Sequence, residues 1–194
     1  MKKIVLASKS PRRKEILENL NIDFDIVLSD ADEDSVDKNL SPELYVGNLA
    51  SIKAFSVCKN MVLEKLVIGA DTIVVLDDKI LGKPKDEEDA INMLKSLSGR
   101  CHSVYTGICV VNSHTGKAVT TYEKTDVYFK KLTDEEIINY VKTKEPMDKA
   151  GAYAVQGLGS IFIEKIDGDY FNVVGLCAFK LAKILKEEFC FEIL

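Results

Sequence analysis

The sequence lacks the features that mark membrane-spanning, secreted and nucleic-acid-binding proteins. Lys and Glu interrupt every apolar run well before the length of a membrane span, and the run at residues 4–7 is too short for a signal-peptide core. A formal net charge of −5 argues against a broad basic face for nucleic acid or an anionic membrane. We therefore expect a cytoplasmic protein with no nucleic-acid or membrane partner, in which any anion site is local.

Clustered cysteine and histidine are also missing. The five cysteines form no C-x-x-C pair and are odd in number, which predicts reduced thiols: Cys58, Cys101, Cys109, Cys177 and Cys190. The two histidines, His102 and His114, have no metal-ligand spacing. We expect His102, in "GRCHSVYTG", to be a structural residue at a strand end.

The common nucleotide-binding and acyl-transfer motifs are absent. There is no G-x-x-x-x-G-K-[ST] loop, no G-x-G-x-x-G after a strand and no G-x-S-x-G. Phosphate chemistry would therefore need a different set of residues.

Apolar periodicity predicts an α/β fold with a mixed β-sheet flanked by helices. The 194 residues, without repeats or linkers, suit one domain or two small lobes that share a core. Strands are expected at 4–7, 24–28, 103–111, 118–129 and 161–166, and as two runs joined through 69–71 before a turn at 77–79. Helices are expected from Pro11, from Pro42, after a cap at Asp86, after a Thr133–Glu136 capping box, and over 178–189.

Cations occupy the start of the first predicted helix, where the helix dipole favours acidic residues. Arg12, Arg13 and Lys14 follow Pro11 directly. Hydroxyls of Ser8 and Ser10, free backbone amides and guanidinium groups would converge there, which suits a phosphate. The alternative is a solvated basic helix end with no function.

Asp71 lies in a nearly continuous apolar run, "VIGADTIVV". An unpaired carboxylate in a buried strand costs several kcal/mol or becomes neutral, so Asp71 needs a cation or a chemical role. The alternative is a carboxylate that caps local turn amides.

A third set consists of Glu33, Lys53 and Lys83, each unremarkable alone. Two carboxylates, two lysines and an arginine-bearing helix start are together the components of Mg²⁺-dependent chemistry on a polyphosphate. In this hypothesis Glu33 and Asp71 hold one Mg²⁺.

Six segments in order resemble the Maf-like nucleotide pyrophosphatases: "LASKSPRRKEIL", "ASIKA", "GADTIVVLDDKILGKP", "LSGRCHSVYTG", "DKAGAYAVQGLGS" and "GDYFNVVGL". The resemblance covers nearly the whole chain, 1–194, as a single Maf-like domain. It implies a two-lobed α/β fold with a central cleft, similar to the inosine triphosphate pyrophosphatases. It also implies cleavage of nucleoside triphosphates between the α- and β-phosphates with a divalent metal, Mg²⁺ or Mn²⁺, and a possible homodimer.

By position, the resemblance makes Asp71 the proton acceptor. Its phosphate-binding set would be Ser8, Ser10, Arg12, Lys53 and Lys83. The branch acting on dTTP and UTP carries Arg, Thr and Gln at the positions of Arg13, Thr72 and Gln156. A glutamine amide, with one donor and one acceptor group, can pair with two groups on the edge of uracil or thymine.

Two segments depart from the family pattern without touching the implied chemistry. Cys177 replaces a common proline, and Ala154 and Val155 stand where Gly and Ile are usual.

Two rival functions remain open from the sequence. One is a nucleotide-binding regulator of cell division that does not hydrolyse its ligand, and the other is a kinase, which would release a diphosphate.

Overall fold

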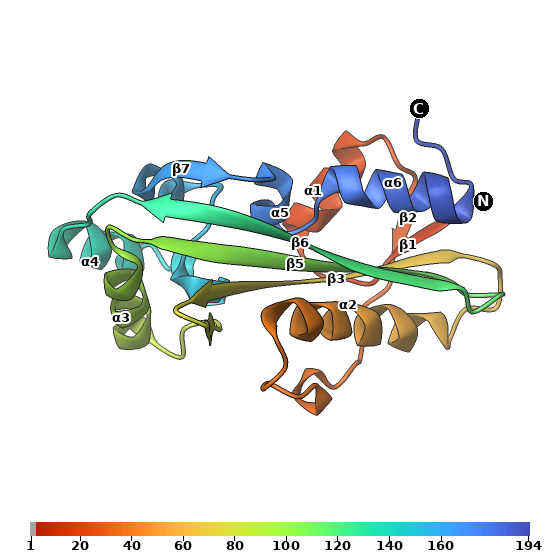
Figure 1. The fold of residues 1–194 in the computed structure, drawn as a ribbon, viewed down its shortest axis with the longest axis horizontal. Coiled ribbons are helices and arrows are strands. Elements are labelled where there is room, and N and C mark those ends of the chain that lie inside the picture. The colour runs from red at the N-terminus through yellow and green to blue at the C-terminus, as the bar shows by residue number, and fades with distance from the viewer. Residues whose placement is uncertain (1–2) are drawn as a thin grey trace. The chain divides into compact units, whose positions relative to one another are not determined.

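The computed structural model describes residues 3–194 as a mixed α/β structure with a seven-stranded sheet, which confirms the predicted fold class (Figure 1). Hydrogen-bonded neighbours follow the order β2-β1-β3-β5-β6-β7, and β4 pairs with β3. The β1 strand pairs in parallel with β2 and β3, whereas β4 and β7 pair antiparallel with β3 and β6. The strands are β1 Ile4–Leu6, β2 Phe24–Ile26, β3 Leu66–Leu76, β4 Lys79–Leu81, β5 Cys101–Asn112, β6 Ala118–Phe129 and β7 Ile163–Asp167.

The chain forms two compact units. The first contains residues 1–71, 106–123 and 175–194, of which 3 onward are described, and the second contains 72–105 and 124–174. Strands β3, β5 and β6 each contribute residues to both units.

Helix boundaries follow the predicted caps. Pro11 and Pro42 open the first two helices, Asp86 accepts a bond from the Asp89 amide, and Thr133 forms the predicted capping box with Glu136. The α-helices are α1 Pro11–Asn19, α2 Pro42–Cys58, α3 Glu87–Leu97, α4 Asp134–Lys142, α5 Tyr170–Val174 and α6 Ala178–Phe189. The 3-10 helices are η1 Glu33–Ser35, η2 Glu145–Asp148, η3 Ala150–Ala152 and η4 Leu158–Phe162.

The two runs expected to join through residues 69–71 form one strand, because β3 runs without interruption from Leu66 to Leu76. Gly69 serves a close approach of helix and strand. A Cβ at this position would lie 2.2 Å from the Ala50 carbonyl oxygen and 2.7 Å from the Ala54 amide nitrogen of α2. The missing side chain therefore lets α2 pack directly on β3.

The segment from residue 158 to residue 174 also differs from the prediction. The expected strand at 161–166 begins later, as β7, after the 3-10 helix η4. The short helix α5, which the sequence analysis did not predict, lies between β7 and α6 and contains Asn172, which is fully buried. The Asn172 side-chain amide donates to the Val104 carbonyl and to the Thr125 hydroxyl, so contacts distant in sequence hold this turn.

Within the first unit, helices cover both faces of the strands: α2 lies on one side, and α1 and α6 lie on the other (Figure 1). One core cluster joins α2 to β1, β3 and β5 through residues such as Val5, Ala54, Val67 and Cys109. In the second unit, Leu94 of α3 and Ile137 of α4 belong to another core cluster. The apolar stripe expected on α3 lies in this cluster. On α2 the prediction is wrong: Leu44 and Phe55, expected on its apolar stripe, are exposed, and Ala50, Ala54 and Val57 face the core instead.

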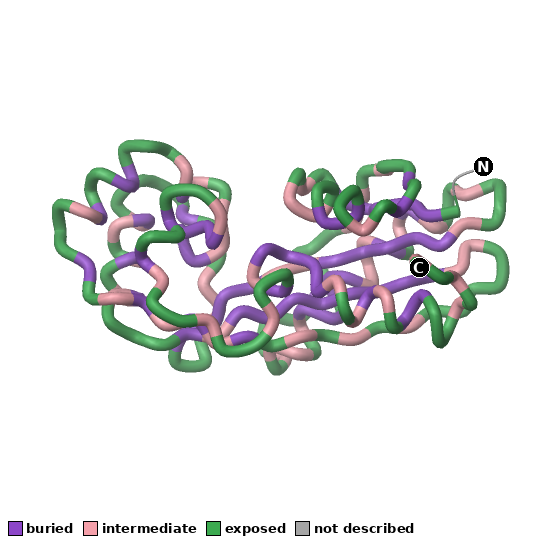
Figure 2. Tube along the Cα trace, turned by 90° about the horizontal axis from the view of Figure 1, so that it is seen from above, coloured by how far each residue is buried: buried purple, intermediate pink, exposed green. Residues whose placement is uncertain are grey.

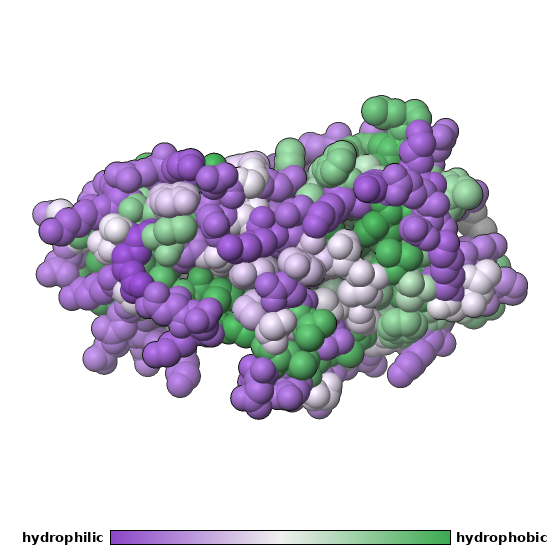
Figure 3. Space-filling model, in the orientation of Figure 1, coloured by the Kyte–Doolittle hydropathy of each residue, from purple (hydrophilic) through white to green (hydrophobic). Residues whose placement is uncertain are grey.

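Buried residues follow the central strands (Figure 2), and hydrophilic side chains cover most of the face in Figure 3. No helix within residues 3–194 is long and apolar enough to cross a bilayer.

Candidate functional site

The loop between β1 and α1 is organised around the hydroxyl of Ser8, which is buried. Ser8 Oγ accepts bonds from the Ser10 amide at 3.2 Å and from Arg13 Nη1 at 3.2 Å. Arg13 Nε also donates to the Gly175 carbonyl at 2.8 Å. Ser10 is the N-cap residue as predicted, but its side chain makes no capping bond. The arginine and serine side chains thus fix this loop directly at the helix start.

The two adjacent arginines differ in their contacts. Burial lowers the pKa of the Arg13 guanidinium, and the nearby Asp71 and Glu33 carboxylates oppose this shift. In contrast, the Arg12 guanidinium has no hydrogen bond or ion pair to any residue within 3–194. The first turn of α1 also has no acidic residue to compensate its charge. Arg12 is therefore the guanidinium available for an anion.

Asp71 lies close to this loop because β1 and β3 run in parallel. Leu6 pairs with Ile68, and the Ala7 amide donates to the Ile68 carbonyl at 2.8 Å. The loop after β1 therefore comes to the level of residues 70–71 of β3.

Lys53 supplies the cation that the sequence analysis requires for Asp71. Lys53 Nζ lies 2.5 Å from Asp71 Oδ1 and 3.0 Å from Glu33 Oε1. The Lys53 and Asp71 side chains are only 12% and 14% exposed, whereas Glu33 is 57% exposed. Both carboxylates thus face one largely buried ammonium group, and turn capping is not needed to explain Asp71.

A pair of serines holds the acidic loop that carries Glu33 against α2. Ser29 Oγ and Ser56 Oγ are 2.7 Å apart, and Ser56 Oγ donates to the Lys53 carbonyl at 3.1 Å. Ser29 Oγ also accepts from the Ala31 amide. Glu33 then opens the 3-10 helix η1. These contacts explain how a residue 20 positions before Lys53 in sequence reaches its side chain.

Tyr45, on α2, is a neighbour of this cluster that the sequence analysis missed. Burial raises the pKa of its phenol, Lys38 opposes that shift, and the Asp71 and Glu33 carboxylates add to it. Tyr45 precedes Lys53 by eight residues, about two helical turns. That spacing is the one feature of the sequence that could have identified it.

Three predicted residues belong to the second unit: Thr72, Lys83 and Gln156. Thr72 follows Asp71 within β3, and Lys83 is an exposed side chain just after β4. Gln156 lies between η3 and η4 and is half-buried. The side chains of Lys83 and Gln156 have no polar partner in the part of the chain that the structure describes, so both are available to a ligand.

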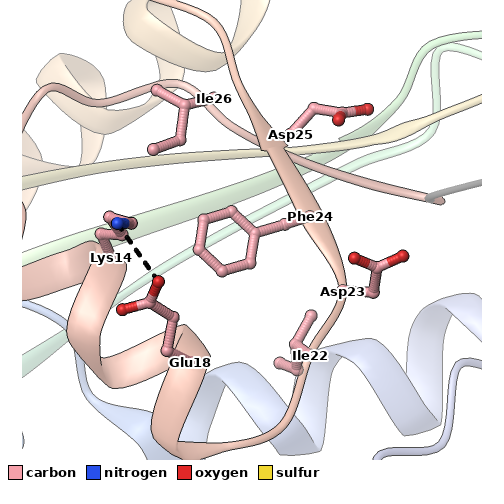
Figure 4. Close-up of a pocket in the computed structure, with 7 residues that line it drawn as sticks. All are labelled: Lys14, Glu18, Ile22, Asp23, Phe24, Asp25 and Ile26. Atoms are coloured by element: carbon pink, nitrogen blue, oxygen red, sulfur yellow. Dashed lines mark ion pairs between the residues drawn. The ribbon is translucent and has the colours of Figure 1, made fainter.

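A pocket of about 400 Å³ lies between α1 and β2, and Figure 4 shows the side chains that line it. None of the predicted site residues lines it. Its cation, Lys14, pairs with Glu18 of the same helix at 3.2 Å, and the Phe24 ring lies beside them. The pocket is therefore separate from the charged cluster. Its lining consists of Lys14, Glu18, Ile22, Asp23, Phe24, Asp25 and Ile26.

Glu33 and Asp71 are the acidic side chains suited to hold a divalent cation. Among the described residues, no group of three or more His, Cys, Asp or Glu side chains could hold a metal. Mg²⁺, however, commonly uses one or two carboxylates and takes its other ligands from water and substrate phosphates. Two carboxylates that already meet at one ammonium group fit that donor set.

The predictions for histidine and cysteine are confirmed. His102 is 3% exposed, and its Nε2 lies 2.8 Å from the Tyr153 hydroxyl. Burial lowers the pKa of His102 to about 4, so the ring is neutral at pH 7 and serves packing. All five cysteines are free thiols.

The fold and these residues define a mixed α/β protein whose charged cluster is chemically suited to phosphates. The sequence pattern of the family described as "Maf-like protein" matches residues 3–188. The "dTTP/UTP pyrophosphatase" of Thermoanaerobacter sp. (strain X514) is 57% identical over 187 residues, covering 96% of this chain and 97% of that protein. Its namesake from Alkaliphilus metalliredigens (strain QYMF) is 50% identical over 194 residues, the whole of both chains.

This chain belongs to the Maf-like protein family. Among solved structures, a HAM1 protein from Coxiella burnetii overlaps with a TM-score of 0.44 at 19% identity, covering 78% of this chain and 86% of that one. No functional conclusion follows from an overlap of this extent.

Proposed function

We propose that this chain hydrolyses dTTP and UTP to the nucleoside monophosphate and pyrophosphate. The observation that carries the proposal is the Lys53 ammonium held between Asp71 and Glu33, with Arg13 in electrostatic reach of both carboxylates. Relatives that match along nearly the whole chain bear the name dTTP/UTP pyrophosphatase, which supports this choice of substrates.

In this mechanism the phosphates are bound by cations and by the loop after β1. Arg12 and Lys83 contact the triphosphate with guanidinium and ammonium groups that have no partner within residues 3–194. Ser8 keeps the loop in shape, and Ser10 adds a hydroxyl at the start of α1. Lys53 stabilises the negative charge that develops as the bond breaks.

Asp71 is the proposed proton acceptor. A water molecule bound by its carboxylate attacks the α-phosphorus and transfers a proton to Asp71, while the bond to the bridging oxygen breaks and pyrophosphate leaves. Lys53 orients the carboxylate through their direct contact. Glu33 and Asp71 would hold a divalent cation, Mg²⁺ or Mn²⁺, which would neutralise phosphate charge.

Gln156 is the proposed reader of the base. Its amide can offer one donor and one acceptor to the edge of uracil or thymine. Arg13 holds the loop after β1, and Thr72 follows the catalytic aspartate. The two-lobed arrangement with a cleft, a homodimer and a cytoplasmic location stay predictions.

The first test is a panel of dTTP, UTP, CTP, ATP, GTP and 7-methyl-GTP with Mg²⁺, in which pyrophosphate and orthophosphate are measured separately. Selective pyrophosphate release from dTTP and UTP is the expected result. Binding without turnover would instead identify a nucleotide sensor, and a diphosphate product would identify a kinase.

The Asp71→Asn variant should retain nucleotide binding and lose turnover, since the amide keeps the shape but cannot accept the proton. Asp77→Asn is the matched control, because Asp77 also pairs with a cation, Arg100, but on the exposed surface. Loss of turnover in both variants would contradict the assignment of Asp71.

A further inference from the structure

The segment that carries Gln156 has little regular structure of its own. This segment, residues 153–159 (the Gln156 segment), follows η3 and includes the first two residues of η4 in the second unit. Residues 153–155 are buried, Gln156 is half-buried, and Gly157 and Leu158 are exposed. The backbone amides here must therefore find partners outside a helix or strand ladder.

Two side chains supply these partners on both sides of Gln156. The Glu145 carboxylate accepts from the Leu158 amide through Oε2 and from the Gly159 amide through Oε1, both at 3.1 Å. On the other side, the Ala154 amide donates to the Tyr140 hydroxyl at 3.3 Å. The Tyr140 hydroxyl in turn donates to Glu145 Oε1 at 2.9 Å, which makes the two side chains one unit.

Glycines let the segment close directly on this pair. Gly157 has φ of +86°, and a Cβ there would lie 2.8 Å from Glu145 Oε2. A Cβ on Gly159 would lie 2.7 Å from the Tyr140 hydroxyl oxygen. A side chain at either position would clash with the pair, so the backbone lies directly against Tyr140 and Glu145. A change in either residue therefore acts on the backbone itself.

The charge states suit this arrangement. Burial raises the pKa of the Tyr140 phenol, and its bond to Glu145 raises it further. The phenol is therefore protonated at neutral pH and donates to the carboxylate, while the Ala154 amide donates to the phenol oxygen.

We infer that Tyr140 and Glu145 are positioning residues that set base specificity by fixing the backbone around Gln156. This inference rests on the proposed function, in which Gln156 reads uracil or thymine. The Gln156 side chain has no polar partner of its own among residues 3–194, so the backbone on either side must orient it. A glutamine that discriminates bases by one donor and one acceptor needs that orientation before the substrate binds.

Three conservative variants separate positioning from simple stability. Tyr140→Phe removes only the bridging hydroxyl, and Glu145→Gln keeps the side-chain size but leaves at least one donor without an acceptor. Glu136→Gln is the matched control, because this carboxylate of α4 accepts from Lys130 and the Thr133 amide, which both lie outside the Gln156 segment. All three should lose some stability, so the decisive readout is selectivity.

The experiment compares kcat/KM for pyrophosphate release from UTP and CTP. We expect Tyr140→Phe and Glu145→Gln to lower the ratio of UTP to CTP roughly tenfold, because small displacements of a reading group have large effects. Glu136→Gln should keep the wild-type ratio. In a Gln156→Ala background, Glu145→Gln should not lower the ratio further. An unchanged ratio in the two positioning variants, or equal loss in Glu136→Gln, would overturn the inference.

Binding of α,β-imido-dUTP and α,β-imido-dCTP provides a readout that does not require turnover. If the wild-type chain releases no pyrophosphate but prefers the uracil analogue, the proposed hydrolysis fails. The inference then stands if the two positioning variants abolish that preference, and it fails if they keep it. A wild-type chain that binds both analogues equally would overturn the inference itself.

Discussion

The adjacent arginines Arg12 and Arg13 at the start of α1 test the assignment of Arg12 to the substrate, because their contacts predict opposite contributions to the free energy of unfolding. Arg12 has no polar partner within residues 3–194 and lies at a helix start whose first turn contains no acid. Its replacement by alanine removes an unfavourable interaction with the helix dipole, worth about 0.3–1 kcal/mol. It also removes repulsion from Arg13. We expect Arg12→Ala to leave the free energy of unfolding unchanged or slightly increased.

Arg13→Ala should have the reverse effect. The change breaks the bonds to the Gly175 carbonyl and to Ser8 Oγ, and hydrogen bonds of charged groups contribute about 1.5–3 kcal/mol each. Relief of the dipole interaction offsets only about 0.3–1 kcal/mol of this loss, so we expect net destabilisation of at least about 2 kcal/mol. The melting temperature should then fall by at least roughly 4–8 °C for a chain of this size.

The assay pairs urea unfolding of both variants with pyrophosphate release from dTTP. Arg12→Ala should lower kcat/KM by about a hundredfold without loss of stability, as expected for a group that contacts transferring phosphates. Marked unfolding of Arg12→Ala, or full activity of that variant, would refute the assignment of Arg12 to substrate. Wild-type stability of Arg13→Ala would refute the role of its contacts in the loop.

Two further predictions concern packing and pH. Gly69→Ala should destabilise the chain by about 3 kcal/mol in urea unfolding. It should also lower activity, because α2, which carries Lys53, must move. Gly82→Ala should be tolerated, because a Cβ there has open space around it, and equal stability of the two variants would contradict the close packing of α2 on β3. The pKa of His102 is depressed from 6.5 to about 4 in the folded state, so the unfolded chain binds more protons between these two pH values. The free energy of unfolding should therefore fall by about 3 kcal/mol as the pH drops from 7 to 4. In His102→Gln this part of the pH dependence should vanish, and an unchanged slope would show that other groups cause it.

The sequence by itself determined the elements and most of the caps. Apolar periodicity located the principal helices, and Pro11, Asp86 and the Thr133 capping box marked where three of them begin. These features depend on interactions within a few residues, so they can be predicted locally. The sequence also identified Asp71 as a carboxylate that needs a cation, since its apolar neighbours predict burial.

Only the tertiary structure decided which residues meet. Gly69 was predicted only to join two apolar runs, because nothing in the local sequence says that α2 will pack against that position. The sequence does not distinguish Lys53 from the other lysines, whereas the fold of the first unit places its ammonium between Asp71 and Glu33. Contacts between residues far apart in the chain depend on strand register and helix packing. Short sequence patterns do not contain that information, which is why the partner of Asp71 had to come from the structure.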